Sequence, residues 1–451
     1  MSADVPSIPI SSLAQPFHVG SVQRLHEVPG RPGWMVSETT RAGSVFDVGS
    51  IFEIDGSDVA RALFRHVLFN RLADPASWRE VRAELEGETG DSVVAGLLLQ
   101  GPLEGLQRGG AATHHIGMLD GATGELVTGA VPDTPSRFNV VRRFRVHHPK
   151  RHRVLGGSVF DYSWFTTADG YVIPLEYLVR FGITTGSSVW QRYQKAAAGQ
   201  RQALLQEWGV TGDFAPWQTL REALVDCSSK YEPEDRAVSR QEAMMMSGLS
   251  AGQFADSLKL ALLGGRMVRR MVAGIGLTLW DLKWELACED GQLVFVDTVD
   301  TDSIRATLSL EVDGRPVAVH VNKQAMRDYY RICHGDWLEG VEQAKREAAA
   351  GGLAFSEVLS AGVERGRFPR VPEVEEAFRR IQGGKMSALV DWLCGRSAPS
   401  EVRSRLEHCG QQEAEYFRGC GRLAEWLDLT ATDTATTEGT RSAGREPVAA
   451  S

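Results

Sequence analysis

The segment from Leu279 to Arg305 contains the residues best suited to chemistry in this sequence. Its first part, LWDLKWEL, alternates apolar and charged residues. Side chains alternate between the two faces of a β-strand, so Asp281, Lys283 and Glu285 share one face and the apolar residues share the other. A charged strand face is usually only solvated surface, so this pattern needs support from the chain that follows it.

The turn after this strand decides where the next acidic residue, Asp297, points. Residues 289–291 can form a two-residue turn, which would put Asp297 on the apolar face beside Trp284, or a three-residue loop with a bulge. The three-residue loop pairs Lys283 with Asp297 and leaves Glu285 one diagonal away. Burying a lone carboxylate on the apolar face would cost several kcal/mol, so we expect the three-residue loop. Two carboxylates at this spacing suit a Mg²⁺ ion that also takes phosphate oxygens, which predicts a nucleotide site.

Composition excludes several classes of protein. The chain has 451 residues, of which 43% are hydrophobic and 24% charged, a balance typical of folded protein. The formal net charge of −9 argues against a protein that binds nucleic acid through a broad cationic face. The longest apolar runs are too short to cross a membrane, and the first residues resemble neither a secretory signal nor a transit peptide. We therefore expect a cytoplasmic protein, with oligomerisation left open.

The six cysteines contain no C-x-x-C pair, so we expect reduced thiols rather than a zinc site or a disulfide framework. His114 and His115 are adjacent and would face opposite sides of a strand. We interpret both as structural residues, with His114 near the cleft.

The order of elements predicts an α+β fold with two lobes. Strand-like segments over 22–54 and 92–186 flank a helix over 58–72, and helical segments cover 191–208, 239–275 and most of 323–427. We expect largely antiparallel sheets on either side of a cleft. The expected divisions are a flexible tail (1–16), a β-rich nucleotide-binding lobe (17–175), an α+β substrate and metal lobe (176–335), a helical extension (336–431) and a disordered tail (432–451).

A series of motifs spread over about residues 18 to 331 resembles the SAICAR synthetase family, the ATP-dependent phosphoribosylaminoimidazole-succinocarboxamide synthases of purine synthesis. The D-x-K-x-E strand, Asp297 and the T-D-S-x-R turn ending at Arg305 are similar to the family pattern. Three motifs resemble the longer branch of the family: FDYSWF, IPLEYLVR and TGSSVWQR. Four more are similar to the family in general: SVFDVG, THHIG, SSKYEPEDR and NKQAMRDYY.

The resemblance implies amide synthesis from ATP, an aminoimidazole ribonucleotide and aspartate, through an acyl phosphate. It implies that Glu285 and Asp297 hold Mg²⁺, that Lys283 neutralises the transferring group and that Asp281 orients Lys283. Lys230 is a third catalytic candidate. Substrate-binding candidates are Ser44, Arg180, Ser187, Ser188, Asp235, Asp302 and Arg305. ATP-binding candidates are Ser21, Val22, Gln23, Arg142 and Glu176.

The sequence departs from the family pattern where phosphate and adenine are handled. Gln23 stands where the family has a lysine, and a second lysine is missing near Asp55-Gly56-Ser57-Asp58. Arg142 and Arg143 replace lysines, which keeps the positive charge but exchanges a compact ammonium group for a planar guanidinium. We therefore expect a diverged ligase in a specialised, antibiotic-type nucleoside pathway. The alternatives are a housekeeping purine enzyme, a nucleotide-binding pseudoenzyme that acts on a partner through its C-terminal helices, and a phosphotransferase.

Overall fold

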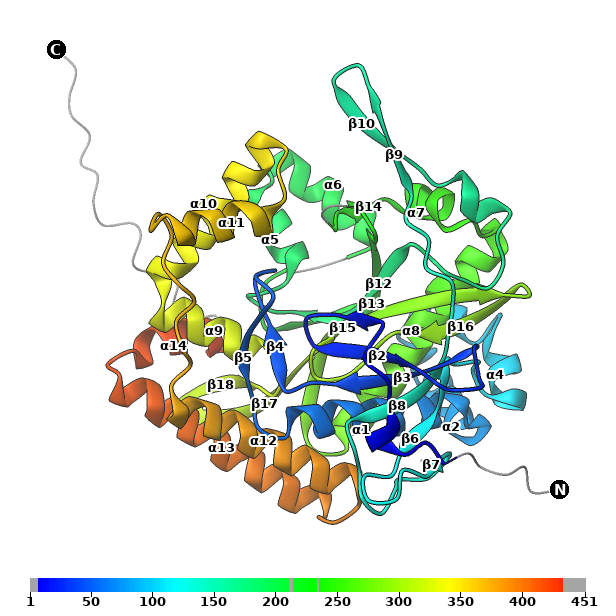
Figure 1. The fold of residues 1–451 in the computed structure, drawn as a ribbon, viewed down its shortest axis with the longest axis horizontal. Coiled ribbons are helices and arrows are strands. Elements are labelled where there is room, and N and C mark those ends of the chain that lie inside the picture. Colours follow the sequence, from blue (N-terminus) through cyan, green and yellow to red (C-terminus); the bar gives the residue numbers. More distant parts are fainter. Residues whose placement is uncertain (1–6, 211–213, 233–234, 433–451) are drawn as a thin grey trace.

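Two antiparallel sheets organise the chain. The computed structural model describes residues 7–210, 214–232 and 235–432, and every pairing between the strands named in this part of the chain is antiparallel. The N-terminal sheet has the order β1 (His18–Val19), β2 (Gln23–Glu27), β3 (Trp34–Thr39), β8 (Phe138–Arg142), β6 (His115–Leu119) and β7 (Leu126–Val127). The mixture of helices with antiparallel sheets confirms the predicted α+β class (Figure 1).

The second sheet has eight strands and carries the acidic strand described above. Its order is β14 (Ala237–Val238), β13 (Gln218–Ser229), β12 (Leu175–Ile183), β15 (Leu277–Glu289), β17 (Ile304–Val312) and β18 (Arg315–His320), with β11 (Tyr171–Val172) and β16 (Gln292–Val296) both paired to β15. The long strand β15 is therefore central to the sheet.

One face of β15 is apolar, as the alternation predicts. Trp284 is completely buried and packs against Phe295 and helix α8 (Ala251–Ala273). Gly264 of α8 makes this close packing possible, because a Cβ atom at that position would lie 2.9 Å from Phe295 and 3.0 Å from Trp284. The opposite face of β15 is thereby left for charged residues.

Helices before and between the strands complete this half of the molecule. α1 (Ser57–Ala73) contacts β3, β6 and β8 of the N-terminal sheet and also α12. The others are α2 (Pro75–Glu88), α3 (Val93–Leu98), α4 (Leu103–Gly109), α5 (Ser188–Lys195), α6 (Ala198–Trp208) and α7 (Arg240–Ser247). Helices α3 and α4 lie where we expected strands, so that part of the strand prediction is wrong. These short apolar stretches have no clear period of their own, and their packing against neighbouring elements decides their conformation.

The C-terminal part is helical, as predicted. It comprises α9 (Gln324–Cys333), α10 (Gly335–Gly351), α11 (Phe355–Glu364), α12 (Glu376–Leu393), α13 (Pro399–Gly419) and α14 (Leu423–Thr430). These helices share an aromatic core that includes Tyr329, Phe378, Phe417 and Trp426. In Figure 1, α12 and α13 run side by side along one edge of the molecule, where they pack against each other.

The N-terminal tail prediction is wrong for residues 7–16. Ile8 is buried, and its backbone N–H donates to the carbonyl of Gly124 over 3.0 Å. A single apolar residue with a backbone partner anchors this segment, although it has no periodic pattern. Residues 1–6 and 433–451, also expected to be tails, lie outside the described residues.

Two smaller sheets and two short 3₁₀ helices, η1 (Ile10–Ser12) and η2 (Ser163–Thr166), complete the fold. β4 (Ala42–Ser44) pairs with β5 (Ser50–Glu53), and β9 (Lys150–Val154) pairs with β10 (Gly157–Asp161) in a hairpin that projects from the body (Figure 1). The six cysteines are free thiols, which confirms that prediction. Within the described ranges, no helix has the length and apolar character needed to span a membrane.

Candidate active site

The turn between β15 and β16 differs from the one we expected. Glu289 pairs with Gln292, so Asp290 and Gly291 form a two-residue turn, and both have positive φ angles (50° and 73°). This geometry is that of a hairpin turn with two left-handed residues. The predicted three-residue loop is therefore wrong, and Glu285 is opposite Val296 rather than one diagonal from Asp297.

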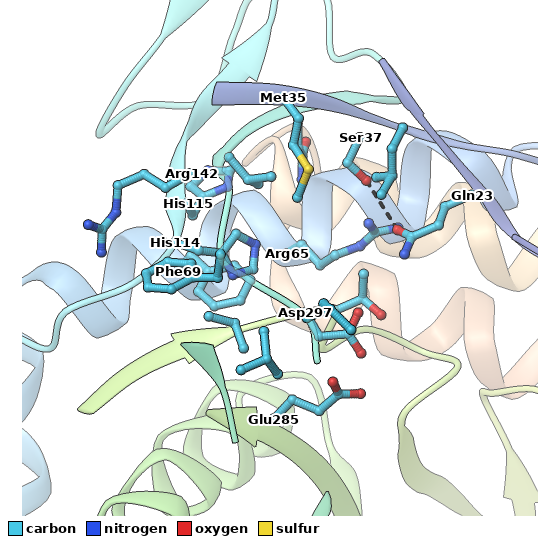
Figure 2. A pocket seen from close by; sticks show the side chains of 18 of the residues that line it. Gln23, Met35, Ser37, Arg65, Phe69, His114, His115, Arg142, Glu285 and Asp297 are labelled. Atoms are coloured by element: carbon cyan, nitrogen blue, oxygen red, sulfur yellow. Dashed lines mark hydrogen bonds between the residues drawn. The ribbon is translucent and has the colours of Figure 1, made fainter. Parts of the chain in front are cut away.

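Asp297 nevertheless reaches Glu285 by a different route. Strand β16 ends at Val296, and Asp297 adopts a left-handed backbone conformation with φ of 60°. This conformation breaks the alternation of the strand, so the carboxylate avoids the apolar face beside Trp284. The two carboxyl groups are hydrogen-bonded to each other, and both line the same cavity (Figure 2).

Two lysines complete a buried acid and amine cluster. Lys283 Nζ lies 2.5 Å from Glu176 Oε1 and 3.4 Å from Glu285 Oε1. Lys230 forms ion pairs with the same two carboxylates. Glu176 comes from β12 and Lys230 follows β13, so three neighbouring segments of the sheet supply the cluster.

The electrostatics of the acidic pair follow from burial and proximity. Burial and the neighbouring charge of Asp297 raise the pKa of Glu285 well above its usual value. Burial alone would raise the pKa of Asp297, but a hydrogen bond from Glu285 and the charges of Lys230 and Lys283 lower it overall. Proximity therefore moves the two pKa values apart, as expected for like charges in close contact.

This pair fits a divalent cation. A Mg²⁺ ion prefers oxygen ligands and commonly uses one or two carboxylates together with phosphate and water. Over the described residues, no cluster of three or more His, Cys, Asp or Glu side chains could hold a metal ion. An ion at Glu285 and Asp297 would therefore take its other ligands from a bound nucleotide and from water.

A cavity of about 230 Å³ opens beside this cluster, between the two sheets. Leu25, Met35 and Val141 line it from the N-terminal sheet, and Val172 and Val296 line it from the second sheet. Apolar walls with a few convergent polar groups at one end are typical of a small-molecule site.

The predicted ATP-binding residues occupy different positions around this cavity. Gln23 lines it and accepts a hydrogen bond from the Ser37 hydroxyl over 3.1 Å (Figure 2). Arg142 also lines it, but its guanidinium pairs with Glu289 over 2.7 Å. Ser21 and Val22 precede Gln23 but do not line the cavity, and their carbonyl oxygens accept hydrogen bonds from the hydroxyl groups of Ser50 and Thr40. Glu176 lies in the acid and amine cluster instead.

A second charged group lies further along the same face of the sheet. Asp281 Oδ2 accepts a hydrogen bond from Arg305 over 2.6 Å and lies 3.5 Å from both Arg180 Nη1 and Ser187 Oγ. Arg180 is almost completely buried and donates to the Ser188 hydroxyl over 3.1 Å. Asp281 therefore holds these arginines rather than Lys283, which corrects the orienting contact that we expected.

The remaining predicted substrate residues are less closely connected. Asp302 pairs with Arg61 over 2.7 Å, Asp235 is exposed in the loop after Lys230, and Ser44 ends β4. In the described chain, no hydrogen bond joins Ser44 to the other predicted residues.

Sequence reasoning missed two arginines of α1. Arg61 and Arg65 are one helical turn apart, and both are buried. Arg65 Nε lies 2.9 Å from Asp300 Oδ2, so the two arginines clamp the turn that follows Asp297 through Asp300 and Asp302. The only sequence signal was a pair of arginines four residues apart in an apolar helix, which does not reveal partners 235 or more positions away.

The two histidines lie at the inner side of the cavity. His115 Nε2 is 2.9 Å from His66 Nδ1, and His114 packs on Phe69. Burial lowers the pKa of His114 to about 4, so it is neutral at ordinary pH. The expected position of His114 near the cleft is confirmed.

The fold and the site define a two-lobed α+β protein with a cavity for a small molecule between its sheets. A family model described as SAICAR synthetase matches residues 158–344. A putative phosphoribosylaminoimidazole-succinocarboxamide synthase of Archaeoglobus fulgidus is 33% identical over 245 residues, which are 54% of this chain and 66% of that protein. The corresponding synthase of Thermoplasma volcanium is 27% identical over 166 residues, which are 36% of this chain and 54% of that protein. The chain belongs to the SAICAR synthetase family, which confirms the resemblance.

The chain is also similar to solved structures of SAICAR synthetases. The SAICAR synthase from Saccharomyces cerevisiae complexed with SAICAR has a TM-score of 0.49 and 15% identity, over 87% of this chain and 98% of that chain. A SAICAR synthetase in complex with ADP has a TM-score of 0.39 and 15% identity, over 69% of this chain and 89% of that chain. The sequence alignments with the Archaeoglobus and Thermoplasma proteins span between about half and two thirds of those proteins' own lengths.

Proposed function

We propose that this chain is an ATP-dependent ligase that joins the carboxylate of an aminoimidazole-type ribonucleotide to an amine, through an acyl phosphate. One observation carries the proposal. At the polar end of a cavity between the two sheets lies a cluster of two acids and two amines: Glu285, Asp297, Lys230 and Lys283. Family membership and this cluster together favour phosphoryl transfer over other uses of such a cavity.

Two bond changes make up the reaction. A carboxylate oxygen of the ribonucleotide bonds to the γ-phosphorus of ATP, and ADP leaves with the electron pair. The amine then bonds to the acyl carbon, phosphate leaves, and the amine nitrogen loses a proton. Lys230 and Lys283 suit the first step: burial lowers their pKa values, but Glu285 and its acidic neighbours raise them overall, so both amines stay charged.

Glu285 and Asp297 would hold Mg²⁺, which supplies charge neutralisation on the ATP phosphates when it is bound. The apolar walls around Met35 and Val296 would take the adenine ring. Gln23 and Arg142 lie on the N-terminal side of that cavity, as expected for ATP-binding residues.

The ribonucleotide phosphate would bind at the cluster around Asp281. Ser188 begins helix α5, and backbone N–H groups at a helix start favour an anion. Arg180 and Arg305 each keep a buried Nε–H group that finds no acceptor among the described residues. Arg305 is the more accessible of the two, and we assign it the direct phosphate contact, with Arg180 positioning Ser188.

We place the reaction in a specialised nucleoside pathway because Gln23 replaces a cation in the nucleotide cavity, and because α13 and α14 add a packed helical layer. The alternative is a housekeeping purine enzyme. A nucleotide-binding pseudoenzyme is a second candidate. The ion pair between Arg142 and Glu289 favours it, because this pair leaves the cavity with one cation fewer for a phosphate.

The test is incubation with 5-amino-4-carboxyimidazole ribonucleotide, aspartate and Mg-ATP, followed by measurement of ADP and of the new amide by mass spectrometry. Amide formation with aspartate supports the ligase and the purine pathway. ADP that forms only with a different carboxylate or amine supports the specialised pathway. Nucleotide binding without turnover for any carboxylate, unchanged in Lys283→Ala, would leave the pseudoenzyme.

A further inference from the structure

The three cations that line the cavity are all held in ion pairs, but they differ in how deeply they are buried. Lys230, Arg142 and Arg65 are its basic lining residues. Lys230 is paired with Glu285 and Glu176, and Arg142 is paired with Glu289. Arg65 is paired with Asp300, and it is the most deeply buried of the three, so its guanidinium is the one that the protein holds most firmly beside the cavity.

Arg65 is held in one orientation by the protein. Its Nε atom lies 2.9 Å from Asp300 Oδ2, and its Nη2 atom donates to Thr39 Oγ1 over 2.7 Å. The side chain is 5% exposed, and its Nη1 makes no hydrogen bond to any described residue. A guanidinium fixed on one side with a free N–H group on the other loses little conformational freedom when it binds an anion.

Gln23 presents a second donor on the same side of the cavity. Ser37 donates to the amide oxygen of Gln23 over 3.1 Å, so the amide oxygen is engaged and the NH₂ group remains. That NH₂ group has no acceptor in the described part of the chain. Figure 2 shows the ends of Gln23 and Arg65 pointing toward each other, above Asp297.

We propose that Arg65 and Gln23 form an anion clamp that binds the phosphate chain of a nucleoside diphosphate or triphosphate opposite Glu285 and Asp297. The charge comes from helix α1, while strand β2 contributes a neutral donor. The clamp rests on the proposed function only in taking a nucleotide as its ligand. Arg65 reaches the site from one turn beyond Arg61, so the same helix also holds the turn that positions Asp297.

A purely structural role for Arg65 is the competing explanation, because its ion pair with Asp300 joins α1 to that turn. Binding of ADP and of adenosine, each measured by calorimetry, separates the two roles. Adenosine has the same base and sugar but no phosphate. Arg65→Gln should weaken ADP binding by roughly 10- to 100-fold, the usual worth of a charged hydrogen bond, and leave adenosine binding within about twofold.

Asp300→Asn is the matched control, since it removes the ion pair but keeps the guanidinium. If Asp300→Asn weakens ADP binding as much as Arg65→Gln, or if Arg65→Gln weakens adenosine and ADP equally, the clamp is overturned. Thermal unfolding of each variant shows whether it is folded, and Arg65→Lys, which keeps a cation, should retain more ADP affinity than Arg65→Gln. Equal ADP affinities in these two variants would also overturn the clamp.

A compensating change tests the part played by Gln23. In the Arg65→Gln variant, the further substitution Gln23→Lys should raise the ADP affinity at least tenfold, because the lysine ammonium group would pair with the same phosphate. A folded double variant with no restoration would overturn the shared position. If wild-type protein binds ADP through Arg65 but makes no amide, the clamp stands and the ligase proposal fails.

Discussion

The carboxyl group of Asp297 is hydrogen-bonded to that of Glu285, although the strand pairing places Val296 opposite Glu285. The left-handed backbone at Asp297 produces this contact. Two carboxyl groups buried side by side are costly unless cations lie close to them. Lys230 and Lys283 supply two such charges, and the carboxyl oxygens also suit a divalent cation.

We predict that Glu285→Gln lowers ligase activity by at least roughly 100-fold, because one anionic metal ligand is lost. Stability should fall by about 1 to 3 kcal/mol, because Lys230 and Lys283 lose one buried counter-charge but keep that of Glu176. Activity assays across a Mg²⁺ titration and urea unfolding check both statements. Glu311→Gln, an exposed acid on β17, is the control and should alter neither quantity. Full activity in Glu285→Gln would refute the metal assignment.

Asp281 leads to a different expectation, because it holds two arginines. Asp281→Asn leaves Arg180, which is 1% exposed, with one counter-charge fewer. We predict a destabilisation of about 3 to 5 kcal/mol and a higher KM for the ribonucleotide with little change in KM for ATP. Denaturant unfolding and steady-state kinetics with each substrate varied in turn measure this. An equal rise in both KM values would contradict a role confined to the phosphate cradle.

The alternation of charged and apolar residues in β15 predicted the two faces of that strand correctly, because side-chain period is a local property. The hairpin register was not predictable in the same way. The cost of burying Asp297 on the apolar face favoured a three-residue loop. The backbone avoids that cost in another way, because it turns at Asp297 itself. A single left-handed residue leaves no pattern in the sequence unless it is glycine or asparagine.

The contacts of Arg61 and Arg65 show the other limit. Both arginines lie in a helix that the sequence predicted, and Asp300 and Asp302 lie in a motif that it singled out. The pairing between them depends on how the first helix, which packs on the N-terminal sheet, meets the turn between β16 and β17 of the second sheet. Such contacts are set by tertiary packing, which no periodicity in either segment reveals.

The C-terminal helices hold a buried ion pair. Lys385 Nζ lies 2.5 Å from Glu413 Oε2, and both side chains are at most 3% exposed. We predict that Glu413→Ala destabilises the protein by about 3 to 5 kcal/mol, because the Lys385 charge is left without a partner. Chemical denaturation measures this. The exposed pair of Arg418 and Asp313 is the control, where Arg418→Ala should cost no more than about 1 kcal/mol.

The double variant Lys385→Met with Glu413→Leu separates the charge from the packing. Replacing both partners removes the desolvation cost, so most of the lost stability should return. If the double variant is as unstable as Glu413→Ala, the loss arises from packing between α12 and α13 rather than from the unpaired ammonium.

Stability should also depend on pH through Asp328 of α9. Burial raises the pKa of Asp328 to about 6, against the partial opposition of Arg331 and Gln324. Because the folded state binds this proton more tightly than the unfolded chain does, the contribution is fully present below about pH 4 and is lost as the pH rises through 6. Between pH 5 and pH 8 the wild type should lose roughly 1 kcal/mol more stability than Asp328→Asn.

His320 faces the same carboxylate, but burial keeps its pKa well below the usual value, so it stays neutral in this range. Urea unfolding of both proteins at several pH values decides the matter, and parallel stability curves would mean that Asp328 is already ionised at pH 5.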